Sequence, residues 1–287
     1  MSTPLLDVLK KATAYFETRG LEAPRVDAEI LIAHGLGLKR IDLYLQHDRP
    51  LAEAELVPLR RLVAERGKGV PVAYLTGVKE FYALPFTVTP AVLVPRPETE
   101  HLVEAGLEAM KADAAPVFAD VGTGSGCVAV AVLHRLPGAR ALATDVSSAA
   151  LAVARGNAER HGVAARFDAR EGHLLDPLRG DPAWGCLDAV LSNPPYVVRG
   201  DPTLERRVAM HEPAVALYVP GPDALAYARD IARAALEALR PGGLVALEIG
   251  STSGPAASEM LAGLGYADVA VVADLGGLPR VARGRRP

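Results

Sequence analysis

Four consecutive residues have the types needed to hold a planar amino group. Asn193, Pro194, Pro195 and Tyr196 follow an apolar run at 187–191 that is typical of a buried strand. Proline lacks an N–H group and has a fixed φ, so two in succession end the strand and stiffen the loop. The carbonyls of Asn193 and Pro194 and the Asn193 side chain offer acceptor oxygens, and Tyr196 offers a flat ring. The pattern favours a site that binds both hydrogens of an –NH₂ group, with a simple Asn-Pro turn as the alternative.

A glycine-rich loop lies between a short apolar strand and an apolar helix. It follows Asp120 and reads Gly-Thr-Gly-Ser-Gly over 122–126. Glycines let the backbone turn sharply and approach a ligand closely, and the N-terminus of the next helix offers free N–H groups. Asp145 ends the following strand, about 20 positions past the glycines, where a carboxylate can accept hydrogen bonds from ribose hydroxyls. This order is typical of a doubly wound nucleoside-binding sheet.

The spacing of the glycines discriminates between nucleotide cofactors. Dinucleotide-binding loops follow G-x-G-x-x-G, whereas this loop follows G-x-G-x-G and lacks the lysine of a P-loop. The carboxylate of Asp120 would repel a pyrophosphate and attract a sulfonium and an ammonium group. We therefore predict S-adenosylmethionine, rather than NAD, as the cofactor.

An adenine ring is expected at the end of the third predicted strand, where His173 and Leu174 follow a glycine. A neutral His173 with a free ring nitrogen can accept a hydrogen bond from the adenine amino group. A surface histidine at a strand end is the alternative. The residues predicted to bind the cofactor are Asp120, Gly122, Thr123, Gly124, Ser125, Gly126, Asp145, His173, Leu174 and Asn193.

Length and composition indicate a soluble protein with a large core. The chain has 287 residues, half of them hydrophobic, which suffices for one large domain and a small one. The formal net charge of -3 argues weakly against a dedicated nucleic-acid binder. Cys127 and Cys186 form no metal-ligand spacing and no disulfide framework, so we expect no metal site and a reducing compartment. With neither a signal pattern nor an apolar run of membrane length, the expected location is cytoplasmic.

The chain divides into three segments by its pattern. Residues 1–75 read as a domain of four helices, and residues 76–98 read as a β-hairpin linker punctuated by proline. Residues 99–287 read as an α/β domain. Its strands are predicted at 117–120, 139–144, 164–170, 187–192, 244–249, 267–273 and 278–283.

The helical segment carries no catalytic constellation. Its acidic and histidine side chains Asp27, Glu29, His34 and His47 are interpreted as surface or capping residues. A small bundle of this kind most often recognises a partner or completes a lid.

The motifs of the α/β domain, in this order, resemble those of a known enzyme class. DVGTGSG at 120–126, TDVSSAALAVARGNAERHGV at 144–163 and LSNPPY at 191–196 are similar to class I S-adenosylmethionine-dependent methyltransferases. The NPPY motif is typical of the branch that methylates planar nitrogens, either N6 of adenine or the side-chain amide of glutamine.

Segments outside these motifs narrow the resemblance to the HemK/PrmC family, the peptide chain release factor N5-glutamine methyltransferases. The segments that resemble this family are GVKEFY at 77–82, VPRPETE at 94–100, HEP at 211–213, RPGG at 240–243 and RVARGR at 280–285. The N-terminal segment agrees with the family in type and length only.

The resemblance implies a doubly wound, Rossmann-like methyltransferase sheet with a small N-terminal helical domain. The loop at 122–126 would wrap the methionine part of the cofactor, and Asp145 would hold the ribose. The family usually has an aspartate where this chain has His173, so this position departs from the pattern.

The resemblance also implies the substrate and its site. Asn193 would bind the substrate amide, with Pro194, Pro195 and Tyr196 completing the catalytic pocket. The target would be the glutamine in the Gly-Gly-Gln motif of release factors, held in part by the helical domain at 1–75. We expect a monomer that needs no direct contact with nucleic acid.

Two other functions fit parts of the pattern. A DNA or RNA adenine-N6 methyltransferase would grip an adenine amino group with the same four residues. Such enzymes extrude their base and usually carry a basic recognition segment, which this chain lacks. A methyltransferase-like scaffold without turnover is the second alternative, and the intact glycine loop and NPPY motif argue against it.

Overall fold

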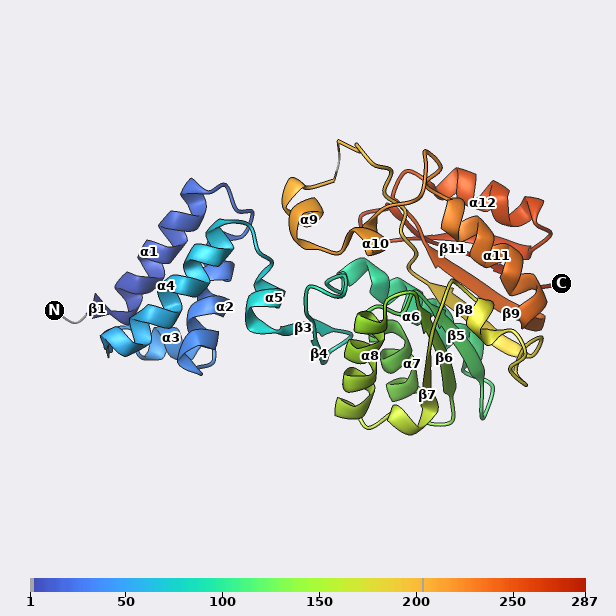
Figure 1. Cartoon of the computed structure of the whole chain (residues 1–287), viewed down its shortest axis with the longest axis horizontal. Coiled ribbons are helices and arrows are strands. Elements are labelled where there is room, and N and C mark those ends of the chain that lie inside the picture. The colour runs from blue at the N-terminus through green and yellow to red at the C-terminus, as the bar shows by residue number, and fades with distance from the viewer. Residues whose placement is uncertain (1–2, 203) are drawn as a thin grey trace. The chain divides into compact units, whose positions relative to one another are not determined.

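The computed structural model describes residues 3–202 and 204–287, and the chain divides into two units. One unit comprises Met1–Val78 with Arg206–His211, and the other comprises Lys79–Glu205 with Glu212–Pro287. Figure 1 labels the helices and strands of both, and each unit is described by itself. No described helix combines the length and the apolar composition that crossing a bilayer requires.

The first unit is a helical bundle with its own hydrophobic core. Leu5, Leu9, Ala12 and Phe16 recur at helical spacing and are buried against the neighbouring helices. The four predicted helices are present, and two short ones were not predicted. The helices are α1 (Leu5–Thr18), α2 (Pro24–Leu36), α3 (Asp42–Leu45), α4 (Glu53–Gly67), α5 (Val72–Thr76) and α9 (Arg206–His211), and the paired short strands are β1 (Thr3–Pro4) and β2 (Pro50–Leu51).

Two acidic side chains of this unit are buried, so the prediction that they lie at the surface was wrong. Asp27 is 8% exposed and accepts a hydrogen bond from Arg66 Nε at 2.8 Å, and Glu29 is 5% exposed and pairs with Arg40. Burial alone would raise the pKa of Glu29, but hydrogen bonds, first among them that from Arg40, hold it below its usual value. Both histidines are exposed, as predicted.

Helix α9 joins the first unit although it lies late in the chain. Arg207 donates from Nη1 to the carbonyl of Gly20 at 3.0 Å and from Nη2 to the carbonyl of Arg19 at 2.6 Å. These carbonyls directly follow α1, where helix ends leave acceptors without intrahelical partners. The helical unit is therefore built from two separate parts of the sequence.

The second unit contains a seven-stranded sheet in the order β10-β11-β9-β8-β5-β6-β7. The strands from β9 to β7 are parallel, whereas β11 runs antiparallel to β9 and β10. This confirms the doubly wound sheet. The strands are β5 (Val117–Val121), β6 (Arg140–Asp145), β7 (Phe167–Glu171), β8 (Leu187–Ser192), β9 (Leu239–Glu248), β10 (Ala267–Ala273) and β11 (Pro279–Arg285), with a separate hairpin of β3 (Val78–Phe81) and β4 (Leu84–Thr87).

Helices cover both faces of the sheet (Figure 1). Phe118 and Leu191 pack with α6 (Glu100–Met110), α7 (Cys127–Arg135) and α8 (Ser148–Arg160), whereas their neighbours Ala119 and Val190 pack with α11 (Ala226–Ala238) and α12 (Gly254–Gly263). Successive strand residues point to opposite faces, so a strand covered on both sides is apolar throughout. The remaining short helices are η1 (Pro97–Thr99), η2 (Ala164–Arg166), η3 (Asp176–Leu178) and α10 (Ala214–Leu217).

Two predicted strand boundaries were wrong. Residues 164–166 form the 3₁₀ turn η2, so β7 begins only at Phe167. Strand β9 begins at Leu239 and continues through the Pro-Gly-Gly segment at 241–243, which was expected to precede it. A shift in register between β8 and β9 accommodates that segment.

The order of the strands reverses between β5 and β8. From β5 the chain proceeds to β6 and β7 on one side, and it then returns to β8 on the other. Ligands of such sheets bind beyond the carboxyl ends of the strands at this switch point. The glycine loop follows β5 and Asn193 follows β8, so the topology brings both candidate motifs to one place.

Candidate active site

A cavity opens at the carboxyl ends of the central strands, with about 1040 Å³ of empty space that is partly continuous with solvent. Most of the predicted cofactor-binding residues line it. The exception is Gly126, which precedes α7 and does not reach the cavity. Of the four predicted catalytic residues, Asn193 and Pro195 line it. Pro194, which is buried, and Tyr196, which is half-buried, are not among its lining residues.

The glycine loop is held in a sharp turn by backbone hydrogen bonds. The N–H groups of Gly122 and Thr123 both donate to the carbonyl of Thr144, at 2.8 and 2.9 Å. Gly126 has a φ of +78°, and a Cβ there would lie 3.1 Å from the Cβ of Ala154. Glycine is required at this position because the left-handed backbone and the close approach of α8 both disfavour a side chain.

Asp120 is directed inward, onto the loop that follows it. Its Oδ2 accepts hydrogen bonds from the hydroxyl of Thr123 at 2.7 Å and from the N–H of Ala129 at 3.2 Å. Burial raises the pKa of Asp120 to about 6, although both hydrogen bonds act in the opposite direction. The carboxyl group therefore lies in the cavity wall and titrates close to neutral pH.

Asp145 links the glycine loop to the end of β6. Its Oδ2 accepts from the N–H of Gly124 and its Oδ1 accepts from the N–H of Ser147, each at 2.9 Å. Ser147 in turn caps α8 by accepting from the N–H of Ala150. Each carboxylate oxygen has a second lone pair, so Asp145 can still accept from a ligand.

The segment after β7 is fastened to the end of β6. The N–H of Gly172 donates to the carbonyl of Asp145 at 2.9 Å, and the hydroxyl of Thr144 donates to the carbonyl of Leu174 at 2.7 Å. Leu174 has a φ of +46°, an unusual value for a side chain of this size. These bonds hold Leu174 and its neighbour His173 at the cavity wall.

Sequence reasoning missed two apolar residues of this part of the cavity. Tyr227, on α11, has its ring centroid 6.2 Å from that of His173, and both rings line the cavity. Val146 follows Asp145, is 47% exposed and also lines the cavity. The position of Val146 directly after Asp145 could have indicated that it lines the cavity. Tyr227 lies on α11, far along the chain from the other motifs, and no local pattern indicated its place in the cavity.

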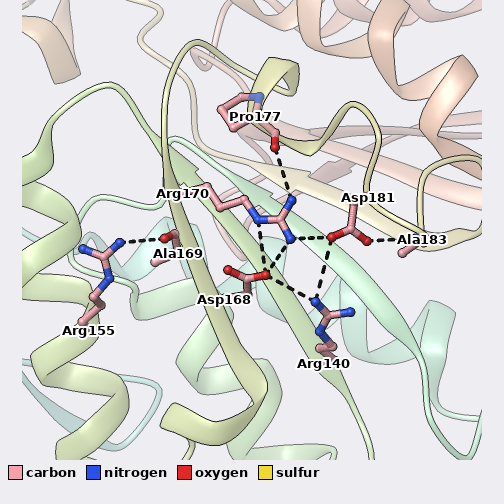
Figure 2. Close-up of polar contacts among 8 residues, drawn as sticks. All are labelled: Arg140, Arg155, Asp168, Ala169, Arg170, Pro177, Asp181 and Ala183. Atoms are coloured by element: carbon pink, nitrogen blue, oxygen red, sulfur yellow. Dashed lines mark hydrogen bonds and ion pairs between the residues drawn. The ribbon is translucent and has the colours of Figure 1, made fainter.

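A polar network outside the cavity fixes the segment that carries His173. Figure 2 shows the Arg170 guanidinium between Asp168 and Asp181, with a further bond to the carbonyl of Pro177. Hydrogen bonds to Asp168 and Asp181 raise the pKa of Arg170. Burial would raise the pKa of Asp181, but a backbone hydrogen bond and the bond from Arg170 lower it below its usual value. Arg170 thereby joins β7 to the loop that returns towards β8.

The Asn193 side chain is held by its nitrogen end. Nδ2 donates to the hydroxyl oxygen of Thr99 at 3.2 Å, across 94 positions of the sequence. Neither Asn193 Oδ1 nor the Pro194 carbonyl accepts a hydrogen bond from any residue the structure describes. Burial raises the pKa of the nearby Tyr196 phenol to about 12, so the ring is neutral. The loop thus presents two acceptor oxygens beside an uncharged aromatic ring.

Arg96 also lines the cavity, and its guanidinium pairs with the buried carboxylate of Glu212. Glu212 accepts a second hydrogen bond from the N–H of Val94 at 3.0 Å. The segments VPRPETE and HEP, which resemble a known family, therefore meet in space. Sequence reasoning also missed Thr99, which lines the cavity, and its position within VPRPETE was the available signal.

Comparison with known proteins agrees with this geometry. Residues 7–77 match the family model of the PrmC N-terminal domain, and residues 102–221 match that of the methyltransferase small domain. Among solved structures, the hMettl16 catalytic domain in complex with the MAT2A 3′UTR hairpin 6 has a TM-score of 0.56 at 16% identity, covering 74% of this chain and 79% of that one. At this identity the likeness concerns the fold alone.

Relatives of the whole chain are more informative. The release factor glutamine methyltransferase of Chlorobaculum tepidum is 41% identical over 96% of this chain and 95% of its own length. That of Nitratidesulfovibrio vulgaris is also 41% identical, over 98% of this chain and 95% of its own length. Identity of this extent shows the family, and the chain belongs to the release factor glutamine methyltransferases.

Proposed function

We propose that this chain transfers a methyl group from S-adenosylmethionine to the side-chain amide nitrogen, N5, of the glutamine in the Gly-Gly-Gln motif of peptide chain release factors. The observation that carries the proposal is the Asn193 amide, whose nitrogen is bound to Thr99 while its oxygen remains available at the cavity. A carboxamide substrate needs such acceptors for its two N–H hydrogens.

The cavity fits the cofactor by its donor and acceptor groups. The turned glycine loop leaves backbone close to the cavity, and Asp145 keeps lone pairs for ribose hydroxyls. Asp120 supplies negative charge for the sulfonium and ammonium groups, while Tyr227 and Val146 offer apolar surface for the adenine. When bound, S-adenosylmethionine supplies the activated methyl group.

The residues after β8 act on the nucleophile. The amide nitrogen of glutamine is a poor nucleophile because its lone pair is delocalised into the carbonyl. Asn193 Oδ1 and the Pro194 carbonyl accept its two hydrogens and stabilise the positive charge that develops on nitrogen. The stiff loop holds the nitrogen in line with the methyl group, and this proximity supplies the remaining gain. The neutral Tyr196 covers one face of the amide.

In this proposal the helical unit, which includes α9, recognises the release factor. We also propose that the enzyme acts as a monomer. A release factor substrate places the enzyme in the cytoplasm, and the amide pocket requires no direct contact with nucleic acid.

A methyl-transfer assay with radiolabelled cofactor tests the function. Release factor, the same factor with alanine in place of the motif glutamine, DNA and RNA are offered side by side. The expected result is label on the intact release factor alone. Label on DNA or RNA, with none on the release factor, would overturn the proposal in favour of an adenine-N6 enzyme.

A further inference from the structure

One arginine on the cavity wall plays no part in the mechanism above. Arg96 directly precedes η1, lines the cavity and has 33% of its side chain exposed. Among the described residues that line this cavity it is the single lysine or arginine, whereas Asp120 and Asp145 contribute carboxyl groups. A guanidinium group presents a fork of N–H donors that matches a carboxylate. The presence of Arg96 therefore indicates that the ligand brings an anionic group to this wall.

Arg96 is held in place from outside the cavity. Its Nη2 donates to Oε1 of Glu212, and Oε2 of Glu212 accepts from the N–H of Val94 at 3.0 Å. The Glu212 side chain is 2% exposed and does not line the cavity, so its carboxylate serves the protein and not a ligand. The N–H of Thr99 donates to the carbonyl of Arg96 at 3.1 Å, which fixes the backbone as well. A donor that is positioned in advance loses little entropy when a ligand binds.

Most of the donors of Arg96 are not used within the protein. A guanidinium group has five N–H donors. Nη2 is bound to Glu212, but Nε and Nη1 donate to no residue within 3–202 and 204–287. Arg280, by contrast, donates from Nε to Asp274 at 2.8 Å, has its Nη2 3.7 Å from Glu98 and does not line the cavity. Arg96 therefore keeps donors for a ligand, whereas Arg280 serves the fold.

The amino-acid end of the cofactor supplies an anion of the required kind. S-adenosylmethionine carries a sulfonium, an ammonium and a carboxylate group, and the mechanism above assigns a partner to the two cations only. Arg96 lies one turn before Thr99, whose hydroxyl oxygen accepts from Asn193 Nδ2 at 3.2 Å. The methionine part of the cofactor must lie near Asn193, because its methyl group is transferred to the amide bound there. The carboxylate and Arg96 are therefore expected at the same end of the cavity.

We propose that Arg96 binds the carboxylate group of S-adenosylmethionine and is a specificity-determining residue for the cofactor. Asp120 and Arg96 then divide the charges of the amino-acid end, since one favours the cations and the other binds the anion. The inference rests on the cofactor of the proposed function and not on its protein substrate. It extends the cofactor site from the carboxyl ends of the strands to the segment that precedes η1.

Decarboxylated S-adenosylmethionine lacks the group that Arg96 binds, so calorimetric titration with both ligands, without release factor, tests the proposal. The wild type is expected to bind S-adenosylmethionine at least about tenfold more tightly than the decarboxylated form, because hydrogen bonds between charged groups contribute on this scale. In Arg96→Met, Kd for S-adenosylmethionine should rise about 10- to 100-fold, while Kd for the decarboxylated form stays within about threefold. An equal rise for both ligands, or an unchanged preference, would overturn the proposal.

A double variant separates direct binding from the charge of Glu212. Arg96→Met alone leaves the buried Glu212 carboxylate unpaired, which destabilises the fold and unmasks a negative charge near the cavity. Arg96→Met with Glu212→Gln removes both charges and is expected to lose the preference for S-adenosylmethionine in the same way. If the double variant regains the wild-type preference, the loss in the single variant came from Glu212 and the proposal fails.

Arg280→Met is the matched control, because it removes an arginine that does not line the cavity. It is expected to leave the preference between the two ligands unchanged. A loss as large as that in Arg96→Met would mean that the preference follows from overall charge and would overturn direct binding by Arg96.

These measurements need no turnover, so they keep the inference distinct from the proposed function. An Arg96→Met enzyme with an unchanged cofactor preference and a raised KM for release factor would show that Arg96 binds the substrate, and only the inference would fail. A wild type whose preference depends on Arg96 but which does not methylate release factor would retain the inference and overturn the proposed function.

Discussion

The N–H of Gly124 donates to Oδ2 of Asp145 at 2.9 Å. This bond fixes the loop after β5 to the end of β6. The N–H of Ser147 donates to Oδ1 of the same carboxylate, so Asp145 holds both segments. The two segments that define the cofactor side of the cavity are therefore positioned together. Where a side chain of either segment faces the cavity, its substitution should affect cofactor binding more than folding.

The glycines of the loop differ in what a side chain would meet. At Gly126 a methyl group would contact Ala154 and force a left-handed backbone, so Gly126→Ala should lower the free energy of unfolding by about 1–3 kcal/mol. Gly122 also has a left-handed backbone, with φ +70°, but a Cβ there meets nothing within 4 Å. Gly122→Ala should therefore weaken cofactor binding with a smaller loss of stability. Gly156→Ala, inside α8, is the control and should raise stability by about 0.5–1 kcal/mol. Urea unfolding measures the stability, and calorimetric titration measures cofactor binding. Equal losses of stability in Gly126→Ala and Gly122→Ala would contradict this prediction.

Binding of S-adenosylmethionine should depend on the protonation of Asp120. Its pKa of about 6 in the free protein means that the carboxyl is largely protonated below that pH. The sulfonium and ammonium groups favour the ionised form, so binding releases a proton and affinity rises with pH, by up to about tenfold per unit between about pH 5 and 6. Titrations below about pH 7 keep the cofactor α-amino group protonated. Asp120→Asn should flatten the dependence, and a wild-type affinity that is constant with pH would refute this role.

The network around Arg170 should contribute to stability rather than to chemistry. Arg170→Met leaves the Asp181 carboxylate, whose side chain is 4% exposed, without its main partner and should cost about 3–5 kcal/mol of unfolding free energy. The pKa of Asp181 is lowered in the folded state, so this stabilisation is present above its ordinary value of 3.8 and is lost as the pH falls through the folded value. Arg155→Met removes only an exposed bond to the carbonyl of Ala169, visible in Figure 2, and should cost less than about 1 kcal/mol. Denaturant unfolding at several pH values measures the unfolding free energy of both variants. Similar losses in Arg170→Met and Arg155→Met would be inconsistent with a buried ion pair at Arg170.

Asn193→Ala should separate catalysis from cofactor binding. Removal of Oδ1 takes away one acceptor that stabilises the developing charge, so kcat should fall about 100- to 1000-fold. In the proposed site this side chain faces the substrate amide, so Kd for S-adenosylmethionine should stay within about twofold. Single-turnover kinetics measures the rate of methyl transfer, and calorimetry measures Kd for S-adenosylmethionine. If both quantities deteriorate together, the loop serves cofactor binding or folding instead.

Much of the α/β fold could be predicted because its strands are buried on both faces. Such strands are largely apolar runs, and the positions of β5 and β8 follow directly from them. The start of β7 could not be predicted in the same way, since this edge strand is half-exposed and the turn η2 before it has a similar composition. The boundary of β9 depends on its register with β8, which no local pattern encodes.

The site shows the same division between local and distant information. The glycine loop, Asp145 and Asn193 are local motifs, and the sheet topology brings them to one cavity. The bond between Asn193 and Thr99 joins residues 94 positions apart. Likewise, the burial of Asp27 depends on Arg66, 39 positions away. Partners at such distances follow from the folded topology and not from spacing in the sequence.

The most direct test is a crystal structure of the enzyme with S-adenosylhomocysteine and a peptide that contains Gly-Gly-Gln. The account predicts that the two hydrogens of the glutamine amide lie on Asn193 Oδ1 and on the Pro194 carbonyl, with the nitrogen facing the sulfur and the Asn193 Nδ2 still bound to Thr99. A glutamine bound elsewhere in the cavity, or an Asn193 amide reversed so that its nitrogen meets the substrate, would contradict it.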